Sequence, residues 1–239
     1  MKTLDELMKT GDVMDIVRNF ECWYKDVCTA ECSLACVRFT EMQHLMQSSG
    51  LPKNRQMPET LTPSDEDYDA FCLLADIKDD IKTFVEQGEN LFICSLNTGN
   101  GKTSWAIKLM LKYFDSIWAG NGLRTRALFV HVPTLLLQLK NFENPLDADY
   151  KRSLTDADLV IWDDVCATTV SNYDYANLLM YLDNRLLNNK ANIFTSNLIT
   201  KGQLEKVLGA RLASRIWETS TIVELKGKDR RNGKFTDIK

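Results

Sequence analysis

An apolar segment running into a glycine-containing turn most constrains the fold of this chain. Residues 91–95 predict a buried strand, and the turn that follows ends in Gly101-Lys102-Thr103. Glycines allow backbone N–H groups to converge on phosphate oxygens, and the N-terminus of a following helix adds partial positive charge. Position 96 holds Leu where the common phosphate-loop pattern has glycine, so we expect Gly99 and Gly101 to supply the flexibility. Residues expected to contact the phosphates of ATP or GTP are Asn97, Thr98, Gly99, Asn100, Gly101, Lys102, Thr103 and Ser104.

Length and composition predict a soluble globular protein. The 239 residues are enough for one main domain and a small accessory one. No apolar run approaches the length of a membrane span, and the first residues are acidic and lack a signal-peptide core, so we expect a cytoplasmic location and no membrane partner. The net charge of −4 argues against nucleic-acid binding over the whole surface. A local basic patch near the C-terminus remains possible.

The order of predicted elements gives a domain plan. Residues 1–50 are mainly helical in pattern and cysteine-rich, and residues 51–69 contain prolines among polar residues and predict a linker. In residues 70–239 helices alternate with apolar strands, which predicts the α/β fold class with a parallel sheet covered by helices on both faces. The predicted strands after the first lie at 127–131, 159–162, 193–196 and 221–225.

A second strand ends in two carboxylates. Asp163 and Asp164 follow the apolar residues 159–162, which is the Walker B arrangement that brings a carboxylate beside the phosphate loop. Asp163 and Thr103 are therefore the expected Mg²⁺ ligands. We expect Asp164 to polarise the attacking water, and because Asp is one methylene shorter than the more common Glu, we predict slow hydrolysis suited to a switch.

Polar and basic residues follow the next strands. Asn197 comes after a strand and fits a role in orienting water near the γ-phosphate, although such an Asn is also a common turn former. Arg211 and Arg215 lie four apart, on one helix face, and could present a guanidinium to the nucleotide of a neighbouring subunit or form surface salt bridges. Arg230 and Arg231 could touch phosphate or bind nucleic acid.

These motifs, taken in order, resemble a known family. The motifs that carry the resemblance are Gly-Asn-Gly-Lys-Thr, Val-Ile-Trp-Asp-Asp, Phe-Thr-Ser-Asn and Gly-Ala-Arg-Leu-Ala-Ser-Arg-Ile. The chain resembles the DnaC/DnaI-type helicase loaders of the AAA+ class, especially those encoded by phages and mobile elements. The resemblance covers about residues 70–231. It implies that Lys102, Asp163, Asp164, Asn197 and Arg215 form the catalytic set, with Asn197 as sensor 1 and Arg215 as the arginine finger. The nucleotide-sensing arginine called sensor 2 is either Arg230 or Arg231, and Arg211 lies one turn before the finger.

The resemblance also implies a function and partners. We expect a slow ATPase that uses ATP and Mg²⁺ to load a replicative DnaB-type helicase onto single-stranded DNA, forming a homo-oligomer when ATP is bound. A AAA+ regulator of DNA transposition of the IstB type is one alternative. A non-enzymatic protein that binds the helicase and inhibits it is another.

Four cysteines lie close together near the N-terminus. In a reducing compartment, four thiolates within a short segment indicate a zinc site, whose binding energy could fold a small module. DnaI-type loaders carry an N-terminal zinc module that contacts the helicase, with a different ligand spacing. The alternatives are an iron–sulfur cluster or, for the last three cysteines, a buried stripe on a continuous helix. The candidate zinc ligands are Cys22, Cys28, Cys32 and Cys36.

Overall fold

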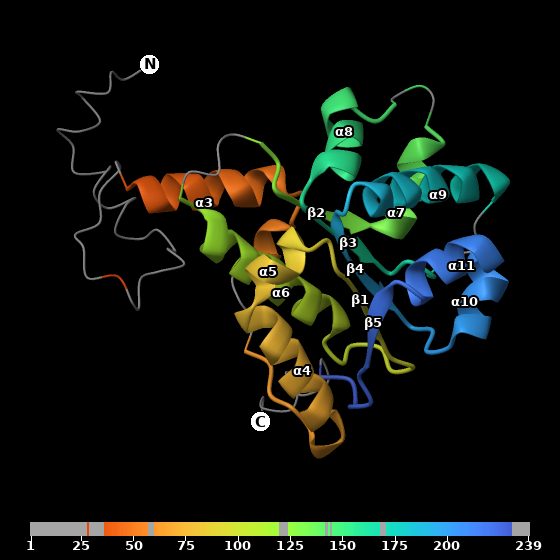
Figure 1. The fold of residues 1–239 in the computed structure, drawn as a ribbon, viewed down its shortest axis with the longest axis horizontal. Helices are drawn as coiled ribbons and strands as arrows, with labels where there is room; N and C mark the ends of the chain where they lie inside the picture. The colour runs from red at the N-terminus through yellow and green to blue at the C-terminus, as the bar shows by residue number, and fades with distance from the viewer. Residues whose placement is uncertain are drawn as a thin grey trace, which may run out of the picture.

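The computed structural model describes residues 28, 36–56, 60–119, 124–141, 143, 145–167 and 171–230. At its centre lies one five-stranded sheet in the order β2-β3-β4-β1-β5, in which every pair of neighbours is parallel (Figure 1). The predicted parallel α/β fold is therefore confirmed. The strands are β1 (Asn90–Cys94), β2 (Ala127–His131), β3 (Leu159–Asp163), β4 (Ala191–Ser196) and β5 (Ser220–Glu224).

Helices cover both faces of the sheet, with α3, α4, α5 and α6 on one side and α7 to α11 on the other (Figure 1). The first face is covered by α3 (Val37–Ser48), α4 (Tyr68–Asp79), α5 (Ile81–Glu86) and α6 (Lys102–Ile117). The second is covered by α7 (Val132–Leu139), α8 (Ala148–Asp156), α9 (Asn172–Leu187), α10 (Lys201–Leu208) and α11 (Ala210–Trp217). Two short 3-10 turns, Lys53–Arg55 and Asp65–Asp67, connect α3 to α4.

Strands β1, β3 and β4 are buried along their whole length because helices cover both sheet faces. In β1, Leu91 and Ile93 belong to the hydrophobic cluster under α3 to α6, whereas Phe92 belongs to the cluster under α7 to α11. This alternation follows from the two-residue period of a strand. The two clusters fix the sheet rigidly, so the loops at the carboxyl ends of the strands start from defined positions.

Residues 37–56 pack onto the main domain. In α3, Met42, Leu45 and Met46 are buried in the same cluster as strands β1 and β3, and Phe129 N donates a hydrogen bond to Ser49 O. The hydrophobic core therefore includes Met42, which lies in the range 1–50 that the sequence assigned to the N-terminal module. The part of the proposed cysteine-rich module that precedes residue 36 lies outside the described residues, apart from Cys28.

The helical pattern has two further details. The chain between β4 and β5 forms two helices, α10 and α11, separated by Gly209 with φ of +81°, a value that an L side chain rarely adopts. Helix α8 has a polar sequence and was not predicted; Asp147 caps it by accepting hydrogen bonds from Asp149 N and Tyr150 N.

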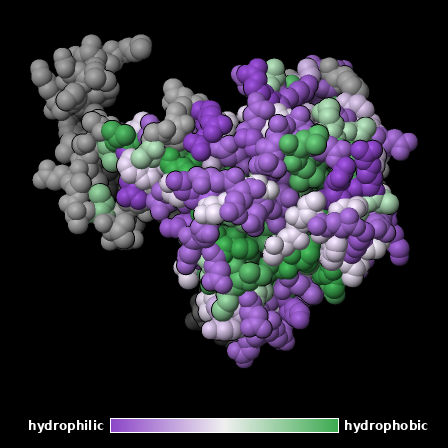
Figure 2. All heavy atoms as spheres, viewed as in Figure 1, coloured by the Kyte–Doolittle hydropathy of each residue, from purple (hydrophilic) through white to green (hydrophobic). Residues whose placement is uncertain are grey.

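The surface seen in Figure 2 is mostly hydrophilic, with hydrophobic side chains gathered in separate patches. Leu137 and Leu187 are the most exposed large hydrophobic side chains among the described residues. None of the helices in the described ranges combines the length and the apolar character required to cross a membrane.

Candidate nucleotide-binding site

The loop between β1 and α6 has the backbone shape of a phosphate cradle. Gly99 and Gly101 adopt φ of +69° and +108°, so the two glycines supply the left-handed conformations that the turn needs in place of a glycine at position 96. Leu96 points to solvent and is 63% exposed. Helix α6 begins at Lys102, and its N-terminal amides and partial positive charge face this loop.

Lys102 is buried within the loop. Its Nζ donates to Asn97 O at 2.9 Å and lies 3.5 Å from Asn100 Oδ1. These two oxygens help to hold the ammonium group over the loop, and a phosphate oxygen could replace them as acceptors. A cation fixed in this position could bind the β and γ phosphates of a nucleotide.

The side chains of Asn97 and Asn100 attach the loop to the segment that follows β5. Asn97 Nδ2 donates to Lys226 O at 2.9 Å and to Gly227 O at 3.1 Å, and Asn100 Nδ2 donates to Leu225 O at 3.0 Å. In addition, Asn100 Nδ2 donates to Ser95 Oγ. These two asparagines therefore act on the shape of the loop in this structure, a role that their position in the motif did not reveal.

Three side chains meet at the carboxyl edge of the sheet: Thr103 from the start of α6, Asp163 from the end of β3 and Thr195 from β4. Asp163 Oδ1 accepts hydrogen bonds from Thr103 Oγ1 at 2.7 Å and from Thr195 Oγ1 at 2.8 Å. Burial raises the pKa of Asp163, while these two hydrogen bonds act in the opposite direction. A hydroxyl and a carboxylate at this distance are the oxygen donors that Mg²⁺ prefers. Thr103 and Asp163, predicted separately from two motifs, therefore form one donor set.

Asp164 is held in an uncommon backbone conformation at the end of β3. Its φ is +55°, and its backbone N–H donates to Thr195 Oγ1 at 2.9 Å. Asp is one of the few side chains that tolerates this region. The ligand atoms of His131, Asp163 and Asp164 lie within 4.8 Å of one another, and the register of the sheet explains this, because His131 is paired with Asp163.

A cavity of about 900 Å³ opens above the phosphate loop. One wall is the loop itself from Thr98 to Ser104, with Asp164 and Asn197 from the neighbouring strand ends. The opposite wall comes from the segment before α4, which the sequence predicted to be a linker. Arg55 Nη1 donates to Ser104 Oγ at 3.2 Å, and Thr60, Leu61 and Thr62 complete this wall.

Arg230 closes the cavity at the end of the described chain. Its backbone N–H donates to Gly99 O at 3.0 Å, its guanidinium lies 5.0 Å from the centre of the Phe71 ring, and it also contacts Thr62 O and Asp67. Its Nε is buried and has no hydrogen-bond partner among the described residues. Because Arg230 lines the cavity and carries a positive charge, it fits an anionic ligand. Arg231 lies outside the described residues.

Arg211 and Arg215 lie away from the cavity. Both reach Asp183 of α9, with Arg211 Nη2 3.2 Å from Asp183 Oδ2 and Arg215 Nε 3.0 Å from Asp183 Oδ1. Arg211 and Arg215 are therefore on one helix face, as their spacing predicts. Neither of them lines the cavity of the same chain.

Several residues of this site were missed by the motif analysis. Thr195 connects both aspartates, His131 adds a third side chain at the strand ends, and Arg55 with residues 60–62 forms a wall. Strand-end positions of β2 and β4 could have indicated His131 and Thr195. Nothing in the sequence near Arg55 indicates its contact with Ser104.

The sheet order, the phosphate loop after β1 and the carboxylates at the end of β3 give this chain a P-loop α/β fold that matches AAA+ structures. The chemistry of the donors fits a magnesium-bound triphosphate. Thr103 and Asp163 suit the ion, and Lys102, the loop amides and Arg230 suit the phosphates.

Solved structures of replication proteins share this fold. The DnaC helicase loader superposes with a TM-score of 0.61 at 17% identity, over 73% of this chain and 100% of that one. DnaI superposes with a TM-score of 0.60 at 19% identity, over 74% of this chain and 95% of that one. DnaA from Aquifex aeolicus bound to AMPPCP gives 0.53 at 19% identity, over 71% of this chain and 50% of that one. No family model and no curated protein sequence matches the chain.

Proposed function

We propose that this protein is an ATP-dependent loader that places a replicative DnaB-type helicase on single-stranded DNA. The observation that carries the ATPase part is the meeting of Thr103 and Asp163 at 2.7 Å beside the buried Lys102. The structural similarity to the DnaC helicase loader and to DnaI supports the loading part. A DnaA structure that shares the fold is bound to AMPPCP and single-stranded DNA, which supports a DNA partner.

The side chains of the cavity have different roles in ATP hydrolysis. Lys102 and Arg230 bind the phosphates, and Thr103 and Asp163 hold Mg²⁺, which when bound neutralises charge on the triphosphate. Asp164 accepts a hydrogen bond from the attacking water and orients it, with Asn197 on the same side of the cavity. Thr195 keeps both aspartates in position. The short Asp164 side chain makes this a slow enzyme, suited to a switch.

Arg215 completes the site of a neighbouring subunit. It lies outside the cavity of its own chain and is partly exposed, so its guanidinium can reach the γ-phosphate of an adjacent copy. ATP then favours a homo-oligomer, and hydrolysis releases the partner, because the two nucleotide states differ in affinity for helicase and DNA. The four N-terminal cysteines, Cys22, Cys28, Cys32 and Cys36, bind zinc and form the docking module for the helicase.

Light scattering after size-exclusion chromatography tests this proposal. The protein is mixed with the replicative helicase of its host, with and without ATP, and zinc is measured on the same sample. We expect a stoichiometric complex whose assembly changes with ATP. Lys102→Ala should remove this dependence by weakening nucleotide binding at least about tenfold, because it deletes the phosphate-binding ammonium. Lys108→Ala, on the same helix but in contact with the Trp105 ring, is the matched control.

The outcomes separate the alternatives. A complex with a transposase in place of the helicase favours a regulator of transposition. A stable helicase complex that ATP does not change, without turnover, favours a helicase inhibitor. Absence of any complex with the helicase in both nucleotide states contradicts the loader.

A further inference from the structure

A basic cavity lies at the edge of the sheet opposite the nucleotide site. Arg126, Asp158 and Lys190 immediately precede β2, β3 and β4, which are adjacent in the sheet. Since the strands are parallel, these three residues meet at the amino edge, about 17 Å of strand away from the phosphate loop. The cavity next to them has a volume of about 460 Å³ and is also lined by Arg124, Lys82 and Tyr113.

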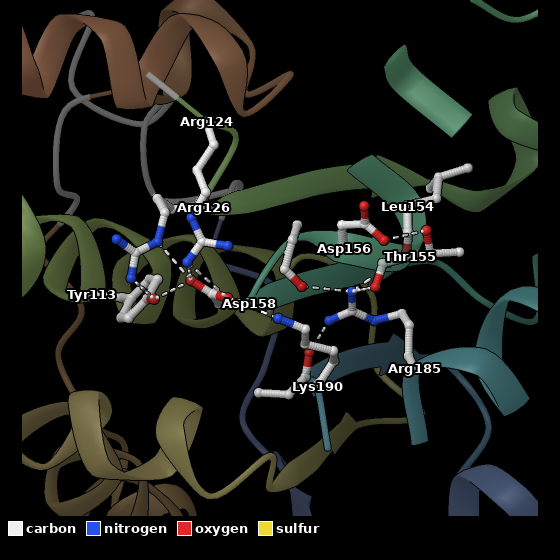
Figure 3. A network of polar contacts seen from close by, with 11 residues as sticks. Tyr113, Arg124, Arg126, Leu154, Thr155, Asp156, Asp158, Arg185 and Lys190 are labelled. Atoms are coloured by element: carbon white, nitrogen blue, oxygen red, sulfur yellow. Dashed lines mark hydrogen bonds and ion pairs between the residues drawn. The ribbon is translucent and has the colours of Figure 1, made fainter. Parts of the chain in front are cut away.

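One carboxylate holds the cations of this cavity in place (Figure 3). Asp158 is 2.6 Å from Arg126 Nε, 3.0 Å from Arg124 Nη2 and 3.0 Å from Lys190 Nζ, and it accepts a hydrogen bond from Tyr113 Oη. Three cations thus ion-pair with one anion, which leaves two excess positive charges. Arg126 Nη2 also donates to Tyr113 Oη at 3.3 Å. Arg124, which is more exposed than Arg126 or Lys190, is therefore the cation best placed to meet another acceptor.

A buried arginine adds to the positive potential from behind. Arg185 is fully buried, and its five hydrogen bonds go to oxygens of the backbone and of Asn192. Burial lowers the pKa of Arg185 to about 9, and it remains charged at neutral pH. The carboxylate of Glu86 also lines the cavity, 3.8 Å from Lys82 Nζ, so this pair is neutral. Asp156 interacts electrostatically with Arg185 and offsets one of these charges. Four cations (Arg124, Arg126, Lys190 and Arg185) still face two carboxylates (Asp156 and Asp158), so the local charge is positive in a chain whose net charge is −4.

We propose that this cavity binds a phosphate group, and that the phosphate belongs to the backbone of single-stranded nucleic acid. Arginine forks match phosphate oxygens in geometry, and fixing them beforehand on Asp158 reduces the entropy lost on binding. The cavity is open to the side chain of Arg124, which is 56% exposed and can follow a chain that enters from solvent. Free phosphate compounds share this chemistry, so the test separates them from nucleic acid. A single-strand site here rests on the proposed function, in which single-stranded DNA is a partner, but its test requires no helicase.

Fluorescence anisotropy with a labelled oligothymidylate of roughly 20 nucleotides tests the nucleic-acid source. We expect Arg124→Glu to weaken binding about tenfold and to reduce the salt slope of log K by about 1. The matched control is Arg152→Glu on α8, an arginine that is 68% exposed and paired with Asp149, with a change below about twofold expected. Thermal unfolding confirms that both variants fold.

A second measurement tests small phosphates. The unfolding temperature of the native chain and of Arg124→Glu is recorded in inorganic phosphate and in chloride at equal ionic strength, with ADP and Mg²⁺ saturating the other site. A small phosphate is the occupant if inorganic phosphate raises the unfolding temperature of the native chain but not of Arg124→Glu, while Arg124→Glu binds DNA as tightly as the native chain. If neither readout separates Arg124→Glu from the native chain, or if Arg152→Glu weakens DNA binding equally, the proposal is overturned. Neither result depends on whether a helicase complex forms.

Discussion

Arg215 and Asp183 form an ion pair between helices α11 and α9, with Nε 3.0 Å from Oδ1. Arg211 binds the other oxygen of the same carboxylate. Because Asp183 engages Arg215 through Nε, the two Nη groups of Arg215 remain for another acceptor. Asp183 therefore fixes the direction of the Arg215 side chain, which the proposed function places toward a neighbouring subunit.

Arg215→Ala is predicted to lower the concentration-dependent part of ATP turnover at least about tenfold, because it removes a guanidinium from the transition state in the adjacent subunit. ATP affinity should stay within about twofold, since Arg215 does not line the cavity of its own chain. Turnover as a function of protein concentration measures the first quantity, and a fluorescent nucleotide titration measures the second. Arg152→Ala is the control. If Arg215→Ala lost as much nucleotide affinity as Lys102→Ala does, the result would count against the assignment of Arg215 as the arginine finger.

Asp183→Asn is predicted to reduce the same stimulated turnover about threefold through poorer orientation of Arg215. The free energy of unfolding should change by less than about 1 kcal/mol, because both partners are partly exposed. Urea unfolding and turnover are measured on one preparation. Unchanged stimulation in Asp183→Asn, together with loss in Arg215→Ala, would show that Asp183 does not position the arginine.

Thr195→Val is predicted to destabilise the protein by about 2 kcal/mol. The valine has a similar shape but leaves Asp164 N–H and Asp163 Oδ1 each without one hydrogen bond. Turnover should fall as well, because both aspartates lose their common partner. Chemical unfolding and steady-state hydrolysis provide the measurements. Thr195→Ser, which keeps the hydroxyl, should recover most of both quantities, and a failure to do so would mean that the methyl group matters instead.

Gly227→Ala is predicted to destabilise the protein by about 2 kcal/mol. A Cβ at this position would lie 2.2 Å from Asp67 Oδ2, and Asp67 is fixed because its other oxygen accepts hydrogen bonds from Lys226 N and Gly227 N. Gly202→Ala in α10 is the matched control: its Cβ would meet nothing within 4 Å, and alanine should stabilise the helix by about 0.5 kcal/mol. Thermal unfolding of the two variants should shift in opposite directions.

Asp158→Asn is predicted to destabilise the protein at neutral pH by about 2 kcal/mol, because Arg126 and Lys190 lose a charged acceptor. Although burial acts to raise it, the hydrogen bonds from Lys190 and Arg126 hold the pKa of Asp158 below its ordinary value. An acid with a lowered pKa stabilises the fold above its unfolded value, and this contribution disappears as the pH falls through the folded value.

The difference in unfolding free energy between Asp158→Asn and the native chain should therefore be constant from about pH 7 to pH 5 and shrink below about pH 4. Urea unfolding across this range measures it. Asp79→Asn, at a carboxylate that is 72% exposed, should change stability by less than about 0.5 kcal/mol at every pH. A difference that grows as the pH falls would contradict the role given to Asp158.

Much of the nucleotide site could be predicted because its motifs are local and lie at strand ends. Thr103 and Asp163 are sixty residues apart, yet both follow parallel strands, and the carboxyl ends of such strands share one edge. The wall from Arg55 to Thr62 could not be predicted. Its contact with Ser104 depends on how α3 and the chain after it pack across the sheet, and composition alone favoured a linker.

The sequence by itself determined the alternation of helices and strands, the backbone turn that Gly99 and Gly101 allow in the phosphate loop, and the order of the candidate site motifs along the chain. These depend on hydrophobic period and backbone conformation, which are properties of short segments. Only the tertiary structure decided that Thr195 bridges both aspartates, that Asp183 holds Arg215, and that Arg126, Asp158 and Lys190 meet at the opposite edge. Those contacts join residues far apart in the chain, and strand order and helix packing bring them together.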